Sequence, residues 1–514
     1  MNLRIHPAAA WPAVLARTRS TAPEAFDAAG HVLNLFEARW QQPGRAKPIT
    51  SPLDGTPLGA LPQLDAETAR RAVEHAAREG AAWGRVDLDQ RRERVAACVG
   101  QLHEHRQLLA SLLAWEIGKP MRQALTSVDR CVSGVRWYID ELERMQRNRP
   151  PLGLVSNIAS WNYPLSVLMH AVLVQVLAGN AAIAKVPTEG GLHALTVAFA
   201  LARRAGLPVS LISGSGAALS EPLVQHPAIA AVAFVGGKST GKNLARGLAG
   251  SGKRFMLEME GVNAYGIWGF SDWDALAGQL RKGFEYAKQR CTAYPRLVVE
   301  RSLMPRFLEM YLGVLGSVKV GHPLLVASDD AELPDVDYAS VICARQVTEL
   351  NAKIDDALAK GAVPIFRGEL SDGAFLPGQD RSAYLAPMAL LGVPRSCELY
   401  HAEPFGPVDS IVVVDTVEEL IAEMNVSNGA LVASVATDDP DLAGSIGREL
   451  RAFKVGHNRT RSRGDRQELF GGVGSSWKGC FVGGELLVRA VTQGPAGERL
   501  HGNFEDYSLM PEAR

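Results

Sequence analysis

A cysteine and a glutamate provide the residue types that covalent chemistry on a carbonyl requires. Cys291 follows Arg290, and Glu258 lies 33 positions before the cysteine. A thiol that a cationic neighbour such as Arg290 holds as thiolate is a nucleophile, and a separate carboxylate can activate water against a thioester. Because most free cysteines are buried small hydrophobes, the thiol alone would not support this interpretation. Together the two residues predict oxidation of an aldehyde to an acid through a covalent intermediate.

The elements that must position these residues alternate from residue 152 onward. Short apolar stretches separated by helical ones are typical of βαβ units around a buried parallel sheet, and right-handed crossovers then give a doubly wound sheet. The expected strands are 152–158, 181–186, 208–212, 229–235 and 254–259, and the expected helices are 164–177, 192–204, one from about 217, and 238–248.

The flanking regions complete this α/β prediction. Residues 66–147 carry apolar residues at helical spacing, with helices expected at 66–83, 89–117 and 125–146. After residue 264 a second alternating set predicts strands at 264–268, 296–300 and 340–342 and helices at 273–287 and 304–315. A second α/β domain is therefore expected at about 265–455. The polar tail after Gly494 is expected to be extended or loosely packed.

Composition excludes several classes of protein. The 514 residues suffice for two or three domains, and 47% hydrophobic with 21% charged residues is ordinary for a globular protein. A formal net charge of -1 does not indicate the excess of positive charge that binding to nucleic acid or an anionic membrane requires. The cysteines form no CxxC pair, which argues against a zinc site or a disulfide framework and favours a reducing cytoplasm. They are Cys98, Cys131, Cys291, Cys343, Cys397 and Cys480.

No secretory signal is visible at the N-terminus. The most apolar stretch, 165–184, is interrupted by His170, Gln175 and Asn180. A buried helix that runs into a strand explains it better than a membrane span.

Seven short motifs, in order and at compatible spacings, resemble the aldehyde dehydrogenase superfamily, and the resemblance covers about residues 49–493. Each motif is weak alone, but the set makes chance improbable. They are Ser160-Trp161-Asn162-Tyr163-Pro164; Ala178-Gly179-Asn180 followed by Lys185; Phe234-Val235-Gly236-Gly237 followed by Gly241; Leu257-Glu258-Met259; Gln289-Arg290-Cys291-Thr292-Ala293; Glu403-Pro404-Phe405-Gly406-Pro407; and Leu469-Phe470-Gly471-Gly472.

The resemblance implies an aldehyde dehydrogenase-like fold. A Rossmann-type cofactor domain would comprise 1–131 and 151–264, and a catalytic α/β domain 265–455. Segments 132–150 and 456–514 would bridge the domains, serve oligomerisation and close the active site. Relatives carry about two more strands near 145–154 that pair between subunits. Since this oligomerisation element is shortened here, a homodimer is expected in place of a tetramer.

The resemblance also assigns the catalytic roles. Cys291 would form a thiohemiacetal whose hydride passes to nicotinamide, while Asn162 and the Cys291 backbone N–H donate to the oxyanion. Glu258 would activate the water that hydrolyses the thioester. Each residue also has a structural explanation: a buried cysteine, a helix-start turn at Asn162, and a surface glutamate at a strand end. A glutamate at this position goes with hydrolysis, whereas relatives that acylate CoA commonly lack it.

The implied cofactor is NADP, with NAD as the alternative. NAD-preferring relatives carry a glutamate three residues after Lys185, where this chain has Thr188, whose hydroxyl can hydrogen-bond a 2′-phosphate. Glu189 lies one place later, and a one-residue slip would restore the carboxylate. Glycines at the start of the 238–248 helix suit a pyrophosphate. The expected cofactor-binding residues are Trp161, Lys185, Thr188, Gly236, Gly237, Gly241, Glu403 and Phe405.

The substrate is expected to be a small aldehyde with a distal negative charge. Arg290 before the nucleophile resembles non-phosphorylating glyceraldehyde-3-phosphate dehydrogenase and succinylglutamate semialdehyde dehydrogenase. Arg459, Arg461 and Arg463 occupy the loop where such enzymes place an anion-binding arginine, although solvated surface charge explains them equally well. The expected substrate-contacting residues are Tyr163, Val167, His170, Arg290, Arg461 and Phe470.

Three residues depart from the family pattern near the site. Glu260 replaces a usual glycine, Val262 a usual lysine, and Lys288 a usual glycine, and the sequence assigns no effect to them. They keep open the alternative of a catalytically idle relative with a binding role. A CoA-acylating aldehyde dehydrogenase is the other alternative, which Glu258 disfavours.

Overall fold

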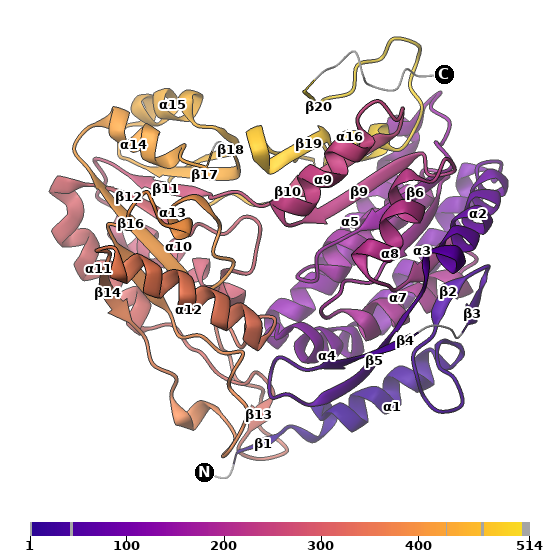
Figure 1. Ribbon diagram of the computed structural model, residues 1–514, viewed down its shortest axis with the longest axis horizontal. Coiled ribbons are helices and arrows are strands. Elements are labelled where there is room, and N and C mark those ends of the chain that lie inside the picture. Colours follow the sequence, from indigo (N-terminus) through magenta and orange to yellow (C-terminus); the bar gives the residue numbers. More distant parts are fainter. Residues whose placement is uncertain (1–2, 42–44, 428, 464–466, 506–514) are drawn as a thin grey trace.

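Two large β-sheets organise the chain (Figure 1). The computed structural model describes residues 3–41, 45–427, 429–463 and 467–505. One sheet has nine strands in the order β20-β19-β10-β9-β6-β7-β8-β2-β3, and the other has seven in the order β14-β15-β16-β12-β11-β17-β18. Two small antiparallel pairs join β1 (Arg4–Ile5) to β13 (Leu325–Val326), and β4 (Arg45–Thr50) to β5 (Pro57–Gln63). The fold is thus α/β, as the sequence predicts.

The nine-stranded sheet is parallel from β10 to β8 and antiparallel at both edges. Because helices cover the parallel centre, β7 is wholly buried there. The strands are β2 (Asn34–Phe36), β3 (Arg39–Gln41), β6 (Leu154–Ile158), β7 (Ala181–Lys185), β8 (Val209–Ile212), β9 (Ala231–Gly236), β10 (Arg254–Met259), β19 (Trp477–Cys480) and β20 (Gly502–Asn503).

Helices surround this sheet in the lobe that Figure 1 colours mainly indigo to magenta. Their starts follow local chemistry: α2, for example, begins where the Asp65 carboxylate accepts the Thr68 N–H at 2.8 Å. The helices are α1 (Trp11–Thr21), α2 (Ala66–Trp83), α3 (Leu88–Glu104), α4 (Arg106–Ile117), α5 (Met121–Gln146), the π-helical turn η3 (Pro164–Met169), α6 (His170–Leu177), α7 (Leu192–Arg204), α8 (Gly216–Ser220), η4 (Glu221–Gln225), α9 (Lys238–Leu248) and α16 (Gly484–Ala490).

The seven-stranded sheet is parallel except for β14, which pairs antiparallel with β15. Its strands are β11 (Ala264–Ile267), β12 (Arg296–Glu300), β14 (Val363–Arg367), β15 (Met388–Leu391), β16 (Val408–Val414), β17 (Ala430–Ala436) and β18 (Ala452–His457). Its helices are α10 (Trp273–Gly283), α11 (Met304–Gly316), α12 (Ala344–Ala359), α13 (Glu398–His401), α14 (Val417–Met424) and α15 (Pro440–Glu449). The exact limits of the two predicted domains stay a prediction.

Several local expectations were wrong. Residues 340–342 form no strand, since Val341 makes a single backbone bond to Ala383 at 2.8 Å. The helix expected at 89–117 is two helices that meet at His105, and the one expected at 273–287 ends at Gly283. By contrast, the described part of the tail after Gly494 contains an extended segment, as the sequence predicts, and there β20 pairs with β19 and extends the large sheet. Between α5 and β6 the structure has no strand within residues 147–153, all of which are described.

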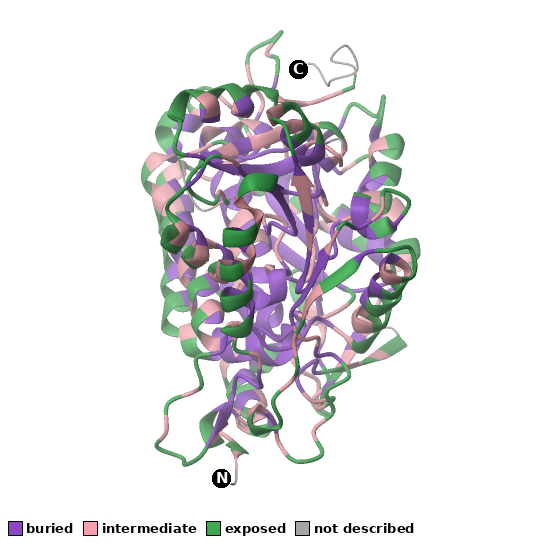
Figure 2. Cartoon of the chain, turned by 90° about the vertical axis from the view of Figure 1, so that its left-hand side faces the viewer, coloured by how far each residue is buried: buried purple, intermediate pink, exposed green. Residues whose placement is uncertain are grey.

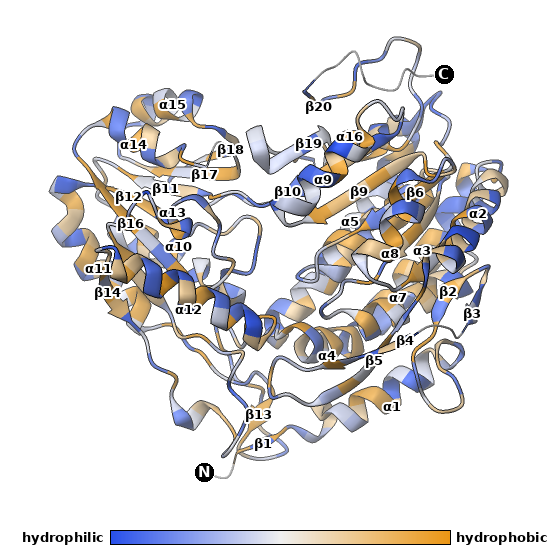
Figure 3. Ribbon diagram, viewed as in Figure 1, coloured by the Kyte–Doolittle hydropathy of each residue, from blue (hydrophilic) through white to orange (hydrophobic). Residues whose placement is uncertain are grey.

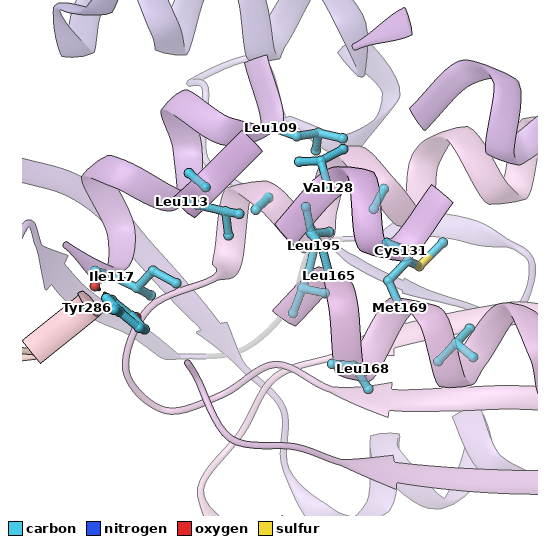
Figure 4. Close-up of a cluster of buried hydrophobic side chains, with 14 of the residues drawn as sticks. Leu109, Leu113, Ile117, Val128, Cys131, Leu165, Leu168, Met169, Leu195 and Tyr286 are labelled. Carbon is cyan, nitrogen blue, oxygen red and sulfur yellow. Dashed lines mark hydrogen bonds between the residues drawn. The ribbon is translucent and has the colours of Figure 1, made fainter. Parts of the chain in front are cut away.

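The principal core lies between the helices of the first lobe. Figure 4 shows side chains of α4, α5, η3 and α7 in one cluster that also takes in Tyr286 from the loop before Cys291. Figure 2 shows buried strands inside and partly exposed helices outside, and Figure 3 shows the matching separation of hydrophobic and hydrophilic residues. Among the described residues no helix has both the length and the apolar character needed to cross a membrane.

Candidate active site

The site lies where the parallel sheet changes direction. β6 is central, β7 and β8 follow on one side, and β9 and β10 lie on the other. In open α/β sheets the carboxyl ends of strands at such a switch point form a ligand crevice. The loop after β6 carries Trp161 and Asn162, and α9 begins directly after β9. Two of the predicted motifs therefore meet at one edge of the sheet.

The backbone before the cysteine turns sharply. Tyr286, Ala287 and Lys288 have φ of 59°, 52° and 55°, a left-handed conformation that side chains other than glycine rarely adopt. Lys288 is buried, and its ammonium donates to the Asp409 carboxylate at 2.8 Å and to the Tyr294 carbonyl at 3.1 Å. The departure at Lys288 thus has a structural account, because a buried ion pair holds this side chain where a glycine is usual.

Asn263 holds the cysteine's own backbone in place. Its amide nitrogen donates to the carbonyl oxygens of Cys291 at 2.8 Å and Ala293 at 2.7 Å. Its amide oxygen accepts the N–H groups of Leu431 and Val432 in β17, at 3.2 and 3.1 Å. Since Asn263 is fully buried, all of these bonds are protected from water. Sequence reasoning did not single it out, although a polar residue between two buried strands was a signal.

Cys291 is partly exposed and faces carboxylates. Burial, and then the Glu258 and Glu403 carboxylates, raise the pKa of the Cys291 thiol well above its ordinary value. Glu258, at the end of β10, is 3% exposed and accepts from the Arg463 guanidinium at 3.2 Å. Arg463 is the cation that lowers the pKa of this thiol, whereas Arg290 turns away to the Lys282 and Gly283 carbonyls. An effect of Arg290 on the thiol requires its side chain to turn inward, and the structure instead directs its guanidinium to those two carbonyls, so Arg463 is the cation beside Cys291 and Glu258.

Asn162 lies beside the same loop, buried, with its side-chain amide donating to the Gln289 carbonyl at 3.0 Å. Its backbone carbonyl accepts from the ammonium of Lys119 at 2.9 Å. That ammonium is buried and lies 4.0 Å from the ring centre of Tyr163 and 4.5 Å from that of Tyr286. Burial lowers the pKa of Lys119 well below its usual range. Sequence analysis did not single out Lys119, which lies between the helices expected at 89–117 and 125–146.

A second group of residues gathers at the end of β7. Lys185 is 8% exposed, and its ammonium donates only to the carbonyl of its neighbour Val186 at 3.0 Å among the described residues. Burial and then the charge of Lys47 lower the pKa of Lys185 to about 8. Lys47, from β4, reaches the Thr188 carbonyl at 3.5 Å. Thr188 is exposed, and its backbone carbonyl is the atom that Lys47 contacts.

Glu189, next to Thr188, is engaged elsewhere. Its carboxylate lies 3.8 Å from the Lys47 ammonium and 3.8 Å from the guanidinium of Arg345, at the start of α12. Neither Lys47 nor Arg345 was predicted from sequence. Their positions could not be inferred, because they come from a distant hairpin and from the other sheet's lobe.

The start of α9 is the third part of this crevice. Gly237 is its N-cap and has no side chain to cap it, and the Lys238 N–H donates to the Glu260 carboxylate at 2.8 Å. Gly241 packs so tightly that a β-carbon would lie 2.4 Å from Met259. Gly236 likewise lies against Phe234, where a β-carbon would meet the ring at 2.6 Å. These glycines bring the helix and strand close together.

The loop after α13 forms the wall of the crevice opposite the start of α9. Glu403 is 6% exposed, and neither carboxylate oxygen has a hydrogen-bond partner among the described residues. Phe405 has a φ of 50° and meets Trp161 edge-on, with ring centres 5.8 Å apart. Trp161 and Phe405, 244 residues apart in the printed sequence, therefore lie on facing sides of the crevice. Val262 contributes differently: it is buried beside Pro295 and Leu399.

A basic cavity opens on the other side of the cysteine loop. Its volume is about 310 Å³, and Tyr163, Arg290 and Arg461 line it, as the sequence predicts for substrate contacts. Further cations on its wall were not predicted; they are Lys119, Arg122, Arg130 and Lys282. Arg122 is paired with Glu285 and Asp335, but Arg130 and Lys282 have no carboxylate partner among the described residues. Arg461 is likewise paired with Glu468 at 2.5 Å, so the cavity's positive charge is compensated only in part, and Arg130, Lys282 and Arg290 lack a carboxylate partner among the described residues.

The remaining predicted contacts lie elsewhere. Val167 lines a separate small cavity of about 40 Å³ together with Glu258 and Arg463. His170 packs edge-on against Tyr138, with ring centres 5.6 Å apart. Phe470 is buried, and the Arg463 guanidinium lies 5.1 Å from its ring centre. The structure therefore places Phe470 beneath the arginine that contacts Glu258, and does not place Val167, His170 or Phe470 in the basic cavity.

The chain is similar to known proteins over most of its length. The model of the aldehyde dehydrogenase family matches residues 40–493. A non-phosphorylating aspartate-semialdehyde dehydrogenase of Halomonas elongata is 29% identical over 455 residues, which cover 85% of this chain and 89% of the relative. An NADP-dependent glyceraldehyde-3-phosphate dehydrogenase of Streptococcus equinus is 26% identical over 482 residues, which cover 89% of this chain and 96% of the relative.

Solved structures agree with this. An NADP-dependent glyceraldehyde-3-phosphate dehydrogenase from Bacillus halodurans, in complex with NADP, has a TM-score of 0.80 and 27% identity, with 90% of this chain and 98% of that chain covered. An indole-3-acetaldehyde dehydrogenase of P. syringae, in complex with NAD+, has a TM-score of 0.81 and 25% identity, with 93% of this chain and 98% of that chain covered.

Proposed function

Because the chain belongs to the aldehyde dehydrogenase family, an enzyme family that oxidises aldehydes with NAD(P), we propose that it is an NADP-preferring dehydrogenase of anionic aldehydes that hydrolyses its own cysteinyl thioester. The observation that carries this proposal is that Cys291, in the loop before β12, lies beside the carboxylate of Glu258, near the end of β10. A nucleophilic thiol beside a carboxylate has the geometry for acylation followed by hydrolysis.

The residues act in a definite order. The Sγ proton of Cys291 passes through Glu258 to solvent, which leaves Glu258 ionised again, and the thiolate attacks the aldehyde carbonyl carbon. One N–H of the Asn162 amide is committed to the Gln289 carbonyl, which leaves its second N–H for the oxyanion. When bound, the nicotinamide cofactor supplies the acceptor for the hydride that leaves the substrate carbon. Glu258 then removes a proton from water, the water oxygen attacks the thioester carbonyl, and the Cys291 sulfur leaves as the acid is released.

The crevice fits a dinucleotide at both ribose ends. The unpartnered oxygens of Glu403 suit ribose hydroxyls, and the weakly engaged ammonium of Lys185 suits the other ribose. Preference for NADP is supported by Lys47 and Lys185 beside Thr188, since two cations favour a 2′-phosphate. Glu189, held between Lys47 and Arg345, is drawn away from the role of a ribose carboxylate.

The basic cavity supports an anionic substrate. Arg130 and Lys282 present charges without carboxylate partners, and Arg290 stands next to the nucleophile. An apolar aldehyde would leave these groups uncompensated, whereas a terminal carboxylate or phosphate would pair with them. Several relatives named for semialdehydes or phosphorylated aldehydes fit this reasoning.

The test compares two aldehydes of equal length, one with a terminal carboxylate and one with a terminal methyl, by cofactor reduction. We expect kcat/KM to be at least tenfold higher for the anion, and Arg130→Met to remove most of that difference. Arg136→Met, on the same helix but outside the cavity, is the matched control and should preserve it. An equal or better kcat/KM for the methyl compound would refute the anionic substrate.

We also propose a cytoplasmic homodimer. The direct passage from α5 to β6 leaves no strand within residues 147–153 to pair with another subunit, and the six cysteines are free, which suits a reducing compartment. Light scattering coupled to gel filtration would test the assembly: a mass of twice 55.2 kDa is expected, and a tetramer would contradict it.

A further inference from the structure

The helix end that faces the cofactor crevice already holds an anion from the chain itself. The Lys238 N–H, in the first turn of the eleven-residue helix α9, donates to the Glu260 carboxylate at 2.8 Å. The first N–H groups of a helix carry a partial positive charge and are the ordinary seat of a phosphate or another anion. The N-cap residue Gly237 has no side chain that could accept a helix N–H. Glu260, directly after β10, supplies the carboxylate acceptor that a capping side chain normally provides.

A second observation shows that this helix end faces a ligand site. Glu403 is 6% exposed, and neither of its oxygens meets hydrogen-bond geometry with a donor among the described residues, while the nearby Gly261 N–H lowers its pKa. Burial and then the Glu260 carboxylate raise the pKa of Glu403 well above its usual range, while the Lys238 ammonium opposes the shift. Glu403 thus lies within electrostatic reach of both members of the helix-end pair. An unsatisfied buried carboxylate at this place points to a missing hydrogen-bond donor.

We propose that Glu260 is an internal competitor for the cofactor's pyrophosphate, holding the start of α9 until the dinucleotide displaces its carboxylate. This inference rests on the proposed NADP-dependent function. The pyrophosphate and the Glu260 carboxylate are both anions, and both are suited to the same backbone N–H. They cannot occupy it together, so dinucleotide binding must move Glu260 away from Lys238.

The side chain of Lys238 offers a second binding position for the displaced Glu260 carboxylate. Its side chain is only partly buried, and its ammonium interacts with Glu260 and Glu403 as well as with the like charge of Lys242. In the structure the Glu260 carboxylate accepts the Lys238 backbone N–H. After displacement it can pair with the Lys238 ammonium while that ammonium also faces the pyrophosphate. Glu260 therefore weakens cofactor binding without abolishing it, which would favour rapid release of the reduced cofactor.

The test is isothermal titration calorimetry of NADP⁺ and NADPH with wild type and Glu260→Gln. The glutamine keeps the shape and the hydrogen-bond acceptor but removes the charge. Charges at helix ends change equilibrium constants by roughly two- to thirty-fold. We therefore expect Kd for both dinucleotides to fall about tenfold in Glu260→Gln, and at least as far in Glu260→Gly.

Two controls separate competition from general effects. Adenosine 2′-monophosphate has no 5′-phosphate, so its Kd should be the same in wild type and Glu260→Gln. Asp65→Asn removes a carboxylate that caps α2, far from the crevice, and should leave the Kd of NADPH unchanged. Thermal unfolding of each variant confirms that it is folded, and Glu260→Gly provides a second charge-free variant if the glutamine variant is not.

Three results would overturn the inference. Equal Kd values for NADPH in wild type and both Glu260 variants would show that the carboxylate does not compete, and would leave the proposed function intact. Weaker binding by Glu260→Gln would show that Glu260 assists the dinucleotide. No binding of any dinucleotide by wild type or variant would refute the proposed cofactor and this inference together.

Discussion

Replacing Glu258 by glutamine should stop turnover and yet make the Cys291 thiol more reactive. Burial is the largest cause of the raised pKa of Cys291, and the Glu258 carboxylate is the next. Glutamine removes that negative charge at nearly constant volume. Because the raised pKa keeps the sulfur protonated, removing a cause of the rise lowers the pKa and increases the thiolate fraction at every pH below it.

The magnitude follows from charge and screening. Two unit charges about 4 Å apart repel by ~4 kcal/mol at an effective dielectric constant of about 20. The Arg463 guanidinium, 3.2 Å from the Glu258 carboxylate, cancels much of this field. A remaining effect of about 1.4 kcal/mol corresponds to a tenfold change in the thiolate fraction.

The assay is alkylation of Cys291 by iodoacetamide from pH 6 to 9 without cofactor, followed by mass spectrometry of the Cys291 peptide. Glu258→Gln should be alkylated about ten times faster than wild type at neutral pH. Glu403→Gln should show a smaller rise, since its carboxylate also raises the pKa of Cys291, and the exposed Glu67→Gln should show none. Slower alkylation of Glu258→Gln would refute the electrostatic reasoning, because Glu258 would then be stabilising the thiolate.

Four other outcomes are expected. In Glu258→Gln, stopped-flow absorbance should show a burst of reduced cofactor with little steady turnover, and an unchanged steady rate would mean that another base acts in deacylation. Cys291→Ala should lose aldehyde oxidation while its calorimetric Kd for NADP stays within about twofold of wild type, and turnover close to wild type would exclude Cys291 as nucleophile. Thr188→Glu should shift the ratio of kcat/KM for NADP over NAD at least tenfold toward NAD, and a native preference for NAD would contradict the role of Thr188. Asn263→Ala should lower the free energy of unfolding in urea by about 2–4 kcal/mol, because it strands two buried carbonyls and two N–H groups, and a loss below ~1 kcal/mol would show that the loop is held otherwise.

The parallel core was predictable because its signals are local. Helices α7 and α9 and strands β10 and β12 begin and end where the sequence predicts, since each is a short periodic segment between glycines, prolines or charged residues. The antiparallel edges were not predicted. β19 pairs with β10 through Met256 and Gly479, residues far apart in the chain, and no local pattern encodes such a partner.

The same distinction applies to the site. The sequence motifs assigned Cys291, Glu258 and Asn162 to one site. In the fold all three lie around the loop that carries Cys291. The contacts that sequence reasoning missed are distant ones: Lys119, which was not singled out, reaches Asn162 across 43 positions, and Arg463, expected to bind a substrate anion, reaches Glu258 across 205. A lysine in a helix break and an arginine in a polar loop look like solvated charge until the tertiary fold shows where they point.

Two of the departures from the family pattern replace a glycine with a charged side chain, and their physical consequences differ. Lys288 has a left-handed backbone, a strain that typically costs about 1–3 kcal/mol, and its ammonium is bound by Asp409 within the same chain. The compensation is internal, so Lys288 affects the stability of the loop before the nucleophile. Glu260 instead binds a backbone N–H that a cofactor also needs. Glu260 therefore affects the equilibrium between enzyme with and without bound cofactor. A substitution of Glu260 should change cofactor affinity more than the free energy of unfolding.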